Sequence, residues 1–268
     1  VAMCVDDLVC AGAAPLFFLD YLAVGRLDPD AAESLVAGIA DGCAEAGCAL
    51  IGGEMAEHPG VMAADQFDLV GFAVGAVERD ALLDGTAAVA GDVLVGIESP
   101  NLRSNGFSLA RRLAFDVAGR SLDDPAWEGA STTLADEMLA PSVIYAPAVV
   151  AALAAHEIHA VAHVTGGGLP GNLPRVMDNT LDAVVDRSTW EVPRFFCELQ
   201  NMGDVSDDEM ERVFNMGLGM VLAVPDRDSD AVVAMLASHD RPARVVGELT
   251  AGSGQVRMSG TRQGGVGS

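Results

Sequence analysis

Lysine is absent from this 268-residue sequence, and all fifteen basic residues are arginine. Against them stand 39 acidic residues, which give a formal net charge of −24. Nucleic acids and anionic membranes are bound through basic surfaces, so this balance argues against both as partners. The absence of lysine also excludes, within these residues, a P-loop lysine and a Schiff-base lysine. Any phosphate bound here must be met by arginine, backbone N–H groups or a metal ion.

Long apolar runs and paired cysteine motifs are also missing. No stretch reaches the roughly 18 uninterrupted apolar residues of a membrane helix, and the start shows no signal-peptide pattern. The five cysteines form no C-x-x-C pair, and their odd number favours reduced, mostly buried thiols. Half of the residues are hydrophobic, enough to build the core of one large or two ordinary domains. We therefore expect a soluble, cytoplasmic protein.

Strand-like and helix-like patterns alternate along the chain, which predicts an α/β or α+β fold. Asp28 and Pro29 begin a helix that Gly47 ends. Residues 49–51 are expected to form a short strand that ends in a turn at residues 52–54. The run 67–77 is apolar on both faces and predicts a strand buried on both sides.

The stretch 79–91 carries Gly, Asp and Thr between two strand-like runs and is the best candidate for a domain boundary. We expect an amino-terminal domain over residues 1–80, a carboxy-terminal domain over residues 81–260, and a flexible Gly-rich tail over residues 261–268. The second domain is expected to contain strands at 92–97, 159–164, 218–224 and 243–249, and helices from 107, at 146–155 and at 229–238.

Two candidate sites in the first domain combine carboxylates with an apolar or glycine-rich setting. Asp6 and Asp7 point about 100° apart on a helix, so at most one faces the core. A metal ion would compensate a buried carboxylate there, and a solvated acidic pair is the alternative. In the second site, Gly52 and Gly53 let the backbone approach a ligand while Glu54 could hold Mg²⁺, although an ordinary turn explains the pattern nearly as well.

The loop 99–106 leads from a strand into a helix. Ser104, Asn105 and the first N–H groups of that helix suit a phosphate, and Arg103 could add bidentate contacts. An ordinary capping loop is the alternative interpretation.

The stretch 163–172 follows a strand and contains G-x-G-x-x-G at Gly166, Gly168 and Gly171. A dinucleotide-binding fold is rejected because Pro170 and Pro174 interrupt the helix that it requires. We interpret the stretch as a glycine-lined anion site with His163 and Asn172 beside it. A purely structural histidine is the alternative.

Together these segments resemble the phosphoribosylformylglycinamidine cyclo-ligases, also called aminoimidazole ribonucleotide synthetases. The resemblance runs in order over nearly the whole chain, which makes it far more specific than any single loop. The segments that carry it are residues 1–8, 15–21, 42–54, 67–78, 104–106, 163–176 and 214–220.

The resemblance implies a ligase of purine biosynthesis that uses ATP and Mg²⁺. Formylglycinamidine ribonucleotide and ATP would give aminoimidazole ribonucleotide, ADP and phosphate. It also implies a homodimer joined through the mixed sheets of its amino-terminal domains, a carboxy-terminal α/β sandwich, and an active site between domains and subunits. Two alternatives stay open. The chain is another ATP-dependent enzyme of the same architecture, of the formylglycinamidine synthase, thiamine-phosphate kinase or selenophosphate synthetase type, or it is a non-catalytic nucleotide-binding dimer module.

The family motifs also imply roles for individual residues. Asp7 and Glu54 match the acids near Mg-ATP, with Gly52 and Gly53 beside the nucleotide. Asn105 and His163 are implied in catalysis. Those implied to bind the substrate are Arg103, Ser104, Gly106, Thr165, Gly166, Gly167, Gly168 and Asn172.

The sequence departs from the family pattern at several positions. Asp6 replaces the usual Asn, and Met55 and His58 replace Thr and Met. Arg103 replaces the usual His of His-Ser-Asn-Gly, and because arginine cannot shuttle a proton near neutral pH, it can only bind or stabilise charge there. The family's upstream Asp-Gly-Val-Gly-Thr-Lys motif is not among these residues, so we expect the chain to be the carboxy-terminal part of a longer enzyme.

Overall fold

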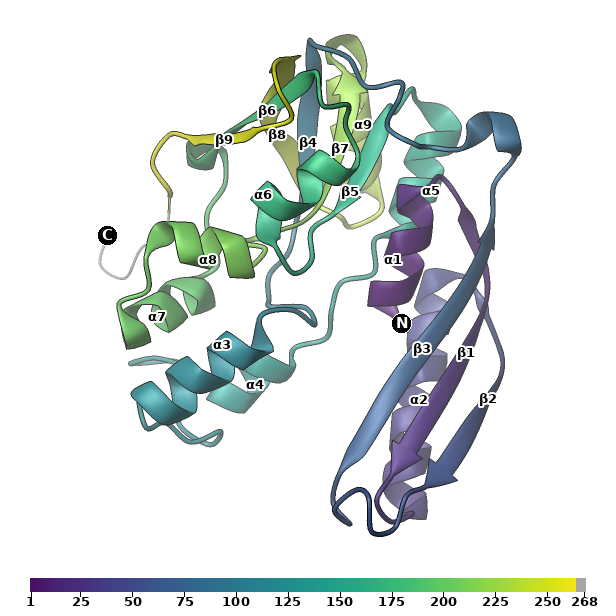
Figure 1. Cartoon of the computed structure of the whole chain (residues 1–268), viewed down its shortest axis with the longest axis vertical. Helices are drawn as coiled ribbons and strands as arrows, with labels where there is room; N and C mark the ends of the chain where they lie inside the picture. Colours follow the sequence, from purple (N-terminus) through teal and green to yellow (C-terminus); the bar gives the residue numbers. More distant parts are fainter. Residues whose placement is uncertain (264–268) are drawn as a thin grey trace. The chain divides into compact units, whose positions relative to one another are not determined.

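The computed structural model describes residues 1–263 and divides into two compact units (Figure 1). The first unit contains residues 1–82 together with 144–150, and the second contains residues 83–143 and the described chain from residue 151 onward. Each unit combines one sheet with helices, so the predicted two-domain α/β fold is confirmed. The return of 144–150 to the first unit was not predicted. No helix in the described range is long and apolar enough to cross a membrane.

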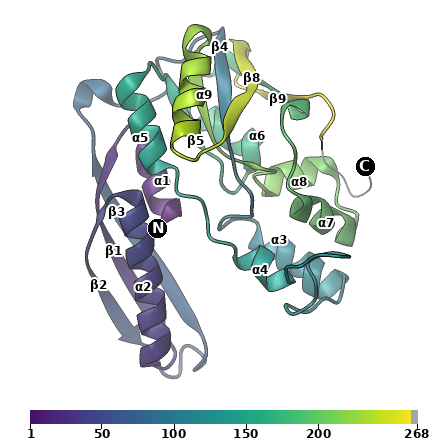
Figure 2. The same cartoon turned by 180° about the vertical axis from the view of Figure 1, so that it is seen from behind.

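The first unit is built on a three-stranded sheet in the order β2-β1-β3. The central strand β1 pairs in parallel with β2 and antiparallel with β3. Figure 2 shows α2 lying along one face of this sheet. The elements are α1 (Ala2–Cys10), β1 (Ala14–Val24), α2 (Pro29–Ala46), β2 (Ala49–Glu57) and β3 (Phe67–Ala76).

The ends of α2 follow directly from the sequence. Asp28 accepts hydrogen bonds from the N–H groups of Asp30 at 3.1 Å and Ala31 at 3.3 Å, and Pro29 fills the first helical position, where no N–H is needed. Gly47 ends the helix at φ 69°, a left-handed conformation that glycine adopts at little cost.

The prediction of a turn at residues 52–54 was wrong, because β2 continues through them to Glu57. Gly53 and Glu54 pair with Asp20 and Tyr21 of β1. This pairing satisfies backbone groups that would otherwise need a turn or water, so the neighbouring strand outweighs the local preference of two glycines.

The prediction that β3 is buried on both faces was also wrong. Gly71 faces Phe18 of β1 and Cys4 of α1, so helix α1 covers that side of the sheet. On the other side Val70 is 49% exposed and Phe72 is 61% exposed. Side chains alternate along paired strands, so this side, called the open face below, is formed by Phe17, Leu19, Tyr21, Val70, Phe72 and Val74.

The second unit is built on a six-stranded sheet in the order β5-β7-β4-β8-β6-β9. Neighbouring strands are antiparallel except β6 and β9. Helix α9 packs against β4 and β8, while α6 packs against α8. Two buried apolar clusters form the core, one around the sheet and one around α3, α7 and α8. The elements are β4 (Asp92–Glu98), α3 (Phe107–Arg111), α4 (Leu134–Leu139), α5 (Ala146–Ala155, which both units share), β5 (Ala160–His163), α6 (Gly168–Asn172), β6 (Leu181–Asp186), α7 (Arg194–Gly203), α8 (Asp207–Val213), β7 (Leu218–Pro225), α9 (Ser229–Ser238), β8 (Ala243–Ala251) and β9 (Val256–Ser259).

The topology of this sheet brings three loops to one edge. Strands β4 and β5 both run antiparallel to β7, so they share a direction and end at the same edge. The loops that follow them, 99–106 and 163–172, therefore lie beside the turn 214–217 that leads into β7. Segments far apart in the sequence meet here because of strand pairing alone.

The part of the predicted tail that the structure describes is anchored. Gln263 bridges to Glu191, and the Arg262 side chain is 13% exposed. Its guanidinium donates to the Asp207 carbonyl oxygen at 2.9 Å and to Glu211 Oε1 at 2.8 Å. Residues 262 and 263 are thus held against the second unit, and residues 264–268 of the expected tail lie outside the described part.

Candidate functional site

The loops 99–106 and 163–172 are joined by a direct hydrogen bond. The Gly166 N–H donates to Asn105 Oδ1 at 3.1 Å. The residues that the sequence assigned to the substrate in these two loops are thus gathered at one edge of the second unit's sheet. Backbone N–H groups and amide side chains at such a place suit an anionic ligand.

Asn172 holds the glycine loop in shape. Its side chain is buried, and Nδ2 donates to the carbonyl oxygens of Gly168 at 2.7 Å and Thr165 at 3.3 Å. Its Oδ1 accepts a hydrogen bond from Thr165 Oγ1 at 3.2 Å. Both ends of the Asn172 side-chain amide are thus bonded within the loop, so Asn172 holds the loop's backbone in place. Helix α6, which begins at Gly168 within this stretch, has only five residues, and this agrees with the rejection of a dinucleotide-binding fold.

Gly168 is the tightest point of the loop. Its φ is 57°, and a Cβ at this position would lie 1.8 Å from the Glu211 carbonyl oxygen. The glycine is therefore required both by its left-handed backbone and by the close approach of α8. Packing of Gly168 against α8 thereby fixes the position of the loop.

We expect Gly168→Ala to destabilise the protein by about 1–3 kcal/mol or more, because the backbone of α8 must shift to admit the methyl group. The loop should move with it, so stabilisation against heat by the substrate should be lost. Calorimetry with and without substrate measures both effects. Gly171→Ala is the matched control, since a Cβ there meets nothing within 4 Å. A Gly168→Ala protein as stable as the Gly171→Ala protein would contradict the prediction.

His163 and Arg103 are both buried at this edge of the sheet, 6% and 3% exposed respectively. His163 is the last residue of β5 and pairs with Met220 of β7. Arg103 has a φ of 57°, and its N–H donates to Asn101 Oδ1 at 3.0 Å. The predicted substrate-binding arginine is thus built into the fold at a strained backbone position, and is not a free surface side chain.

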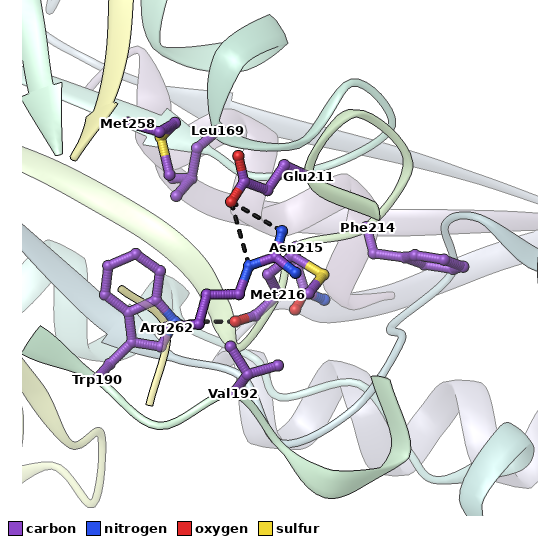
Figure 3. Close-up of a pocket in the computed structure, with 9 residues that line it drawn as sticks. All are labelled: Leu169, Trp190, Val192, Glu211, Phe214, Asn215, Met216, Met258 and Arg262. Atoms are coloured by element: carbon purple, nitrogen blue, oxygen red, sulfur yellow. Dashed lines mark hydrogen bonds and ion pairs between the residues drawn. The ribbon is translucent and has the colours of Figure 1, made fainter. Parts of the chain in front are cut away.

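Glu211 lies on α8 between two arginines, an arrangement that no sequence pattern predicted. Arg187 donates to both of its carboxylate oxygens, from Nε at 2.6 Å and from Nη2 at 2.9 Å. Figure 3 shows Arg262 hydrogen-bonded to Glu211 beside a small cavity that Trp190 and Asn215 also line. Burial alone would raise the pKa of the Glu211 carboxyl, but the hydrogen bonds from the two arginines outweigh it and lower the pKa below its usual value. Glu211 is therefore a charged, structural anchor of the helix that supports the glycine loop.

In the first unit, Glu54 lies on β2 opposite Tyr21 and so on the open face. The Met55 N–H donates to Glu54 Oε1 at 2.9 Å, and Glu54 remains exposed. Gly53 beside it leaves room for Asp20, because a Cβ at Gly53 would lie 2.2 Å from Asp20 Oδ1. Asp20, to which the sequence assigned no role, lines a surface hollow together with Gly52, Gly53 and Glu54.

The adjacent acids Asp6 and Asp7 have different surroundings, in agreement with the expectation that at most one faces the core. Asp6 is fully buried, and its Oδ1 accepts hydrogen bonds from the N–H groups of Tyr145 and Ala146, both at 2.9 Å. It therefore caps the beginning of α5, a role for which Asp serves as well as the family's Asn. Asp7 is exposed on α1.

The structure does not bring Asp7 and Glu54 together within one copy of the chain. Helix α1 packs on the covered face of the sheet, against β1 and β3, whereas Glu54 lies on the open face of β2. Among residues 1–263, no three His, Cys, Asp or Glu side chains gather so as to hold a metal ion. Carboxylates remain suitable donors for Mg²⁺, which usually takes only one or two from the protein when phosphates supply the rest. The metal role of both acids stays a prediction.

Comparison with known proteins matches both units. Residues 1–77 match the AIR synthase related protein N-terminal domain, and residues 89–259 match the corresponding C-terminal domain. A phosphoribosylformylglycinamidine cyclo-ligase of Geotalea daltonii is 47% identical over 249 residues, which is 93% of this chain and 71% of the relative. Two solved structures share the fold. Hydrogenase maturation protein HypE in complex with ATP has a TM-score of 0.72 at 19% identity, with 97% of this chain and 75% of that chain covered. Thiamine-monophosphate kinase from Stenotrophomonas maltophilia has a TM-score of 0.69 at 22% identity, with 96% and 76% covered.

The two domains thus define an AIR synthase related protein. Within that class, the 47% identity to a cyclo-ligase over 93% of this chain decides the family. The chain belongs to the phosphoribosylformylglycinamidine cyclo-ligase family. The predicted family is confirmed, and so is the predicted enzyme class, a ligase that forms a carbon–nitrogen bond.

Proposed function

We propose that this protein closes the imidazole ring of aminoimidazole ribonucleotide in purine biosynthesis, in the cytoplasm. ATP transfers its γ-phosphoryl group to the formyl oxygen of formylglycinamidine ribonucleotide, and ADP leaves. The amidine nitrogen then attacks the activated carbon and expels phosphate. The observation that carries the proposal is the hydrogen bond between Asn105 and Gly166, which joins the two loops that the family resemblance assigns to the substrate.

The residues of the second unit bind and orient the substrate. Ser104 and the glycine loop bind the ribonucleotide's phosphate, and a site of this kind needs no lysine. Asn105 and His163 contact the reacting end, and Arg103 stabilises negative charge without transferring a proton. Chemistry of this kind depends mainly on positioning and charge neutralisation.

The residues of the first unit bind the nucleotide. Glu54 and Asp7 hold Mg²⁺, which when bound neutralises the charge of the triphosphate. Gly52 leaves the backbone of β2 accessible beside Glu54, and Gly53 makes room for Asp20. Since these two acids lie on different faces in one copy, we assign them to sites that two copies share.

A homodimer through the open face would place Glu54 of each copy at the boundary between the two copies. An apolar face of this kind is unusual on the surface of a monomer and typical of a protein interface. A second copy that pairs with it would bury Val70 and Phe72 and would bring its own Glu54 to the boundary. A two-fold interface is formed by the same patch on both subunits, so the open face alone is sufficient to form a dimer.

We expect Phe72→Glu to convert the dimer to a monomer, because two carboxylates would be buried near the two-fold axis without partners. Sedimentation of the full-length protein measures the change, which should lower dimer affinity by roughly 100-fold or more. Val61→Glu is the control, since Val61 is 84% exposed in a loop away from the open face. A Phe72→Glu protein that remains a dimer would remove the open face as the interface.

The activity itself is tested with the full-length protein by a coupled assay for ADP. Release of ADP is expected with formylglycinamidine ribonucleotide and not with thiamine phosphate or selenide, and the product should be the ring-closed ribonucleotide. Heat stabilisation by each compound provides a second readout. Absence of ADP release with formylglycinamidine ribonucleotide and Mg-ATP would refute the proposal.

A further inference from the structure

The turn after β4 and the turn before β7 are linked at the sheet edge that carries the substrate loops. The Ser99 N–H donates to the Gly217 carbonyl oxygen at 2.8 Å, which continues the pairing of the two strands beyond their ends. Both turns contain a buried asparagine, Asn101 at 5% and Asn215 at 4% exposure. Buried amides are retained only where their donors and acceptors are satisfied, so their contacts indicate what they do.

The two asparagines form one interlocked set of hydrogen bonds. Asn215 Nδ2 donates to the Asn101 carbonyl oxygen at 2.9 Å, and its Oδ1 accepts from the Gly217 N–H at 2.8 Å. Asn101 Oδ1 accepts from the Arg103 N–H at 3.0 Å, and its Nδ2 donates to the Pro141 carbonyl oxygen at 2.8 Å. Each amide thus uses both its donor and its acceptor, and the set connects residues 114 positions apart in the chain.

This set of hydrogen bonds around Asn101 and Asn215, called the interlock below, surrounds two unusual backbone positions. Arg103 has a φ of 57° and Met216 a φ of 51°, in the left-handed region that residues with side chains rarely occupy. Such conformations persist where the surroundings fix them. Asn101 Oδ1 accepts the N–H of Arg103 itself, and Asn215 Oδ1 accepts the N–H that follows Met216. Each side chain therefore stabilises one of the two left-handed residues.

The direction of the chain after Arg103 decides where the substrate loop lies. Ser104 follows at once, and Asn105 forms the link to Gly166 of the glycine loop. We infer that Asn101 and Asn215 are positioning residues, which hold Arg103 and Ser104 in register with the glycine loop without contacting the substrate. This role rests on the function proposed above, and it adds two residues to which the sequence motifs had assigned none.

Kinetics of the full-length protein test the inference with Asn101→Ala, Asn215→Ala and the double variant. At a temperature where all are folded, each single variant should lower kcat/KM for formylglycinamidine ribonucleotide by about tenfold or more, because a displaced loop misaligns the substrate. The KM for ATP should stay within about twofold. The double variant should be no worse than the poorer single one, since all three break one interlock.

A general loss of stability would give a different pattern. It would lower melting temperatures while leaving kcat/KM unchanged at low temperature, or would affect both substrates alike, and either result would overturn the inference. Multiplicative losses in the double variant would also overturn it. Asn201→Ala is the control, because Asn201 is exposed on α7 and should change nothing.

Amide hydrogen exchange gives a readout that needs no activity. In Asn215→Ala, the amides of residues 103–106 should exchange faster while those of β4 remain protected. Unchanged exchange at 103–106 would overturn the inference whatever the kinetics show. If the unsubstituted protein closes no ring but exchange at 103–106 responds to Asn215, the proposed function fails and the structural link between the two turns stands.

Discussion

A dimer that combines one Asp7→Asn chain with one Glu54→Gln chain is expected to recover activity that neither homodimer has. Each single variant should lose about 100-fold or more in kcat, because the proposed site would lose a carboxylate assigned to Mg-ATP. Within one copy the two acids lie on opposite sides of one sheet, and the shared site proposed above takes one acid from each copy. In the mixed dimer one site then lacks both acids and the other keeps both.

Tandem purification with two different tags isolates this mixed dimer, and about half of the activity of the unsubstituted dimer is expected, since one of two symmetric sites is intact. The reciprocal control places both substitutions in one chain and pairs it with an unsubstituted chain. Each shared site then lacks one acid, so this dimer should be inactive. The opposite pair of results, an inactive first dimer and a half-active second one, would show that both acids serve the same copy.

Replacement of Glu211 by Gln is expected to be the most destabilising single change in the second unit. The carboxylate is buried between the guanidinium groups of Arg187 and Arg262, which contact it at 2.6 and 2.8 Å. Removal of one member of a buried ion cluster leaves the others uncompensated, which costs about 3–5 kcal/mol. Denaturant unfolding of the full chain measures the loss. Glu211→Gln should also impair substrate binding, because the backbone of this residue supports Gly168.

The matched control on the same helix is Glu209→Gln. Glu209 pairs with Arg212 at 2.7 Å, but the Arg212 side chain is 68% exposed, so the change should cost about 0–1 kcal/mol. Similar losses for the two variants would contradict the anchoring role of Glu211.

The contribution of Glu211 to the free energy of unfolding should decrease as the pH is lowered. Its pKa in the folded protein is lowered from the ordinary value of 4.5, so it binds a proton more readily when unfolded. Its contribution to stability is therefore complete above about pH 4.5 and is lost as the pH falls through the lower, folded pKa. The difference in unfolding free energy between the unsubstituted protein and Glu211→Gln should be constant near neutral pH and shrink below pH 4.5. A difference that grows on acidification would rule out a charged Glu211.

The sequence by itself determined the family and the elements whose signals are local. The ends of α2 follow from Asp28 and Gly47, and the expected helices at 146–155 and 229–238 match α5 and α9. These depend on periodicity and capping within a few residues, which are present in the sequence. The family motifs likewise identified the loops that meet at one edge of the second sheet.

Tertiary structure decided everything that depends on a distant partner. Residues 52–54 form a strand because β1 lies beside them, and β3 has an open face because the helices pack on only one side. Glu211 looks like one of several surface acids until Arg187 and Arg262, 24 and 51 positions away, converge on it. Strand pairing and the burial of charge are properties of the folded chain, set by contacts that no local pattern encodes.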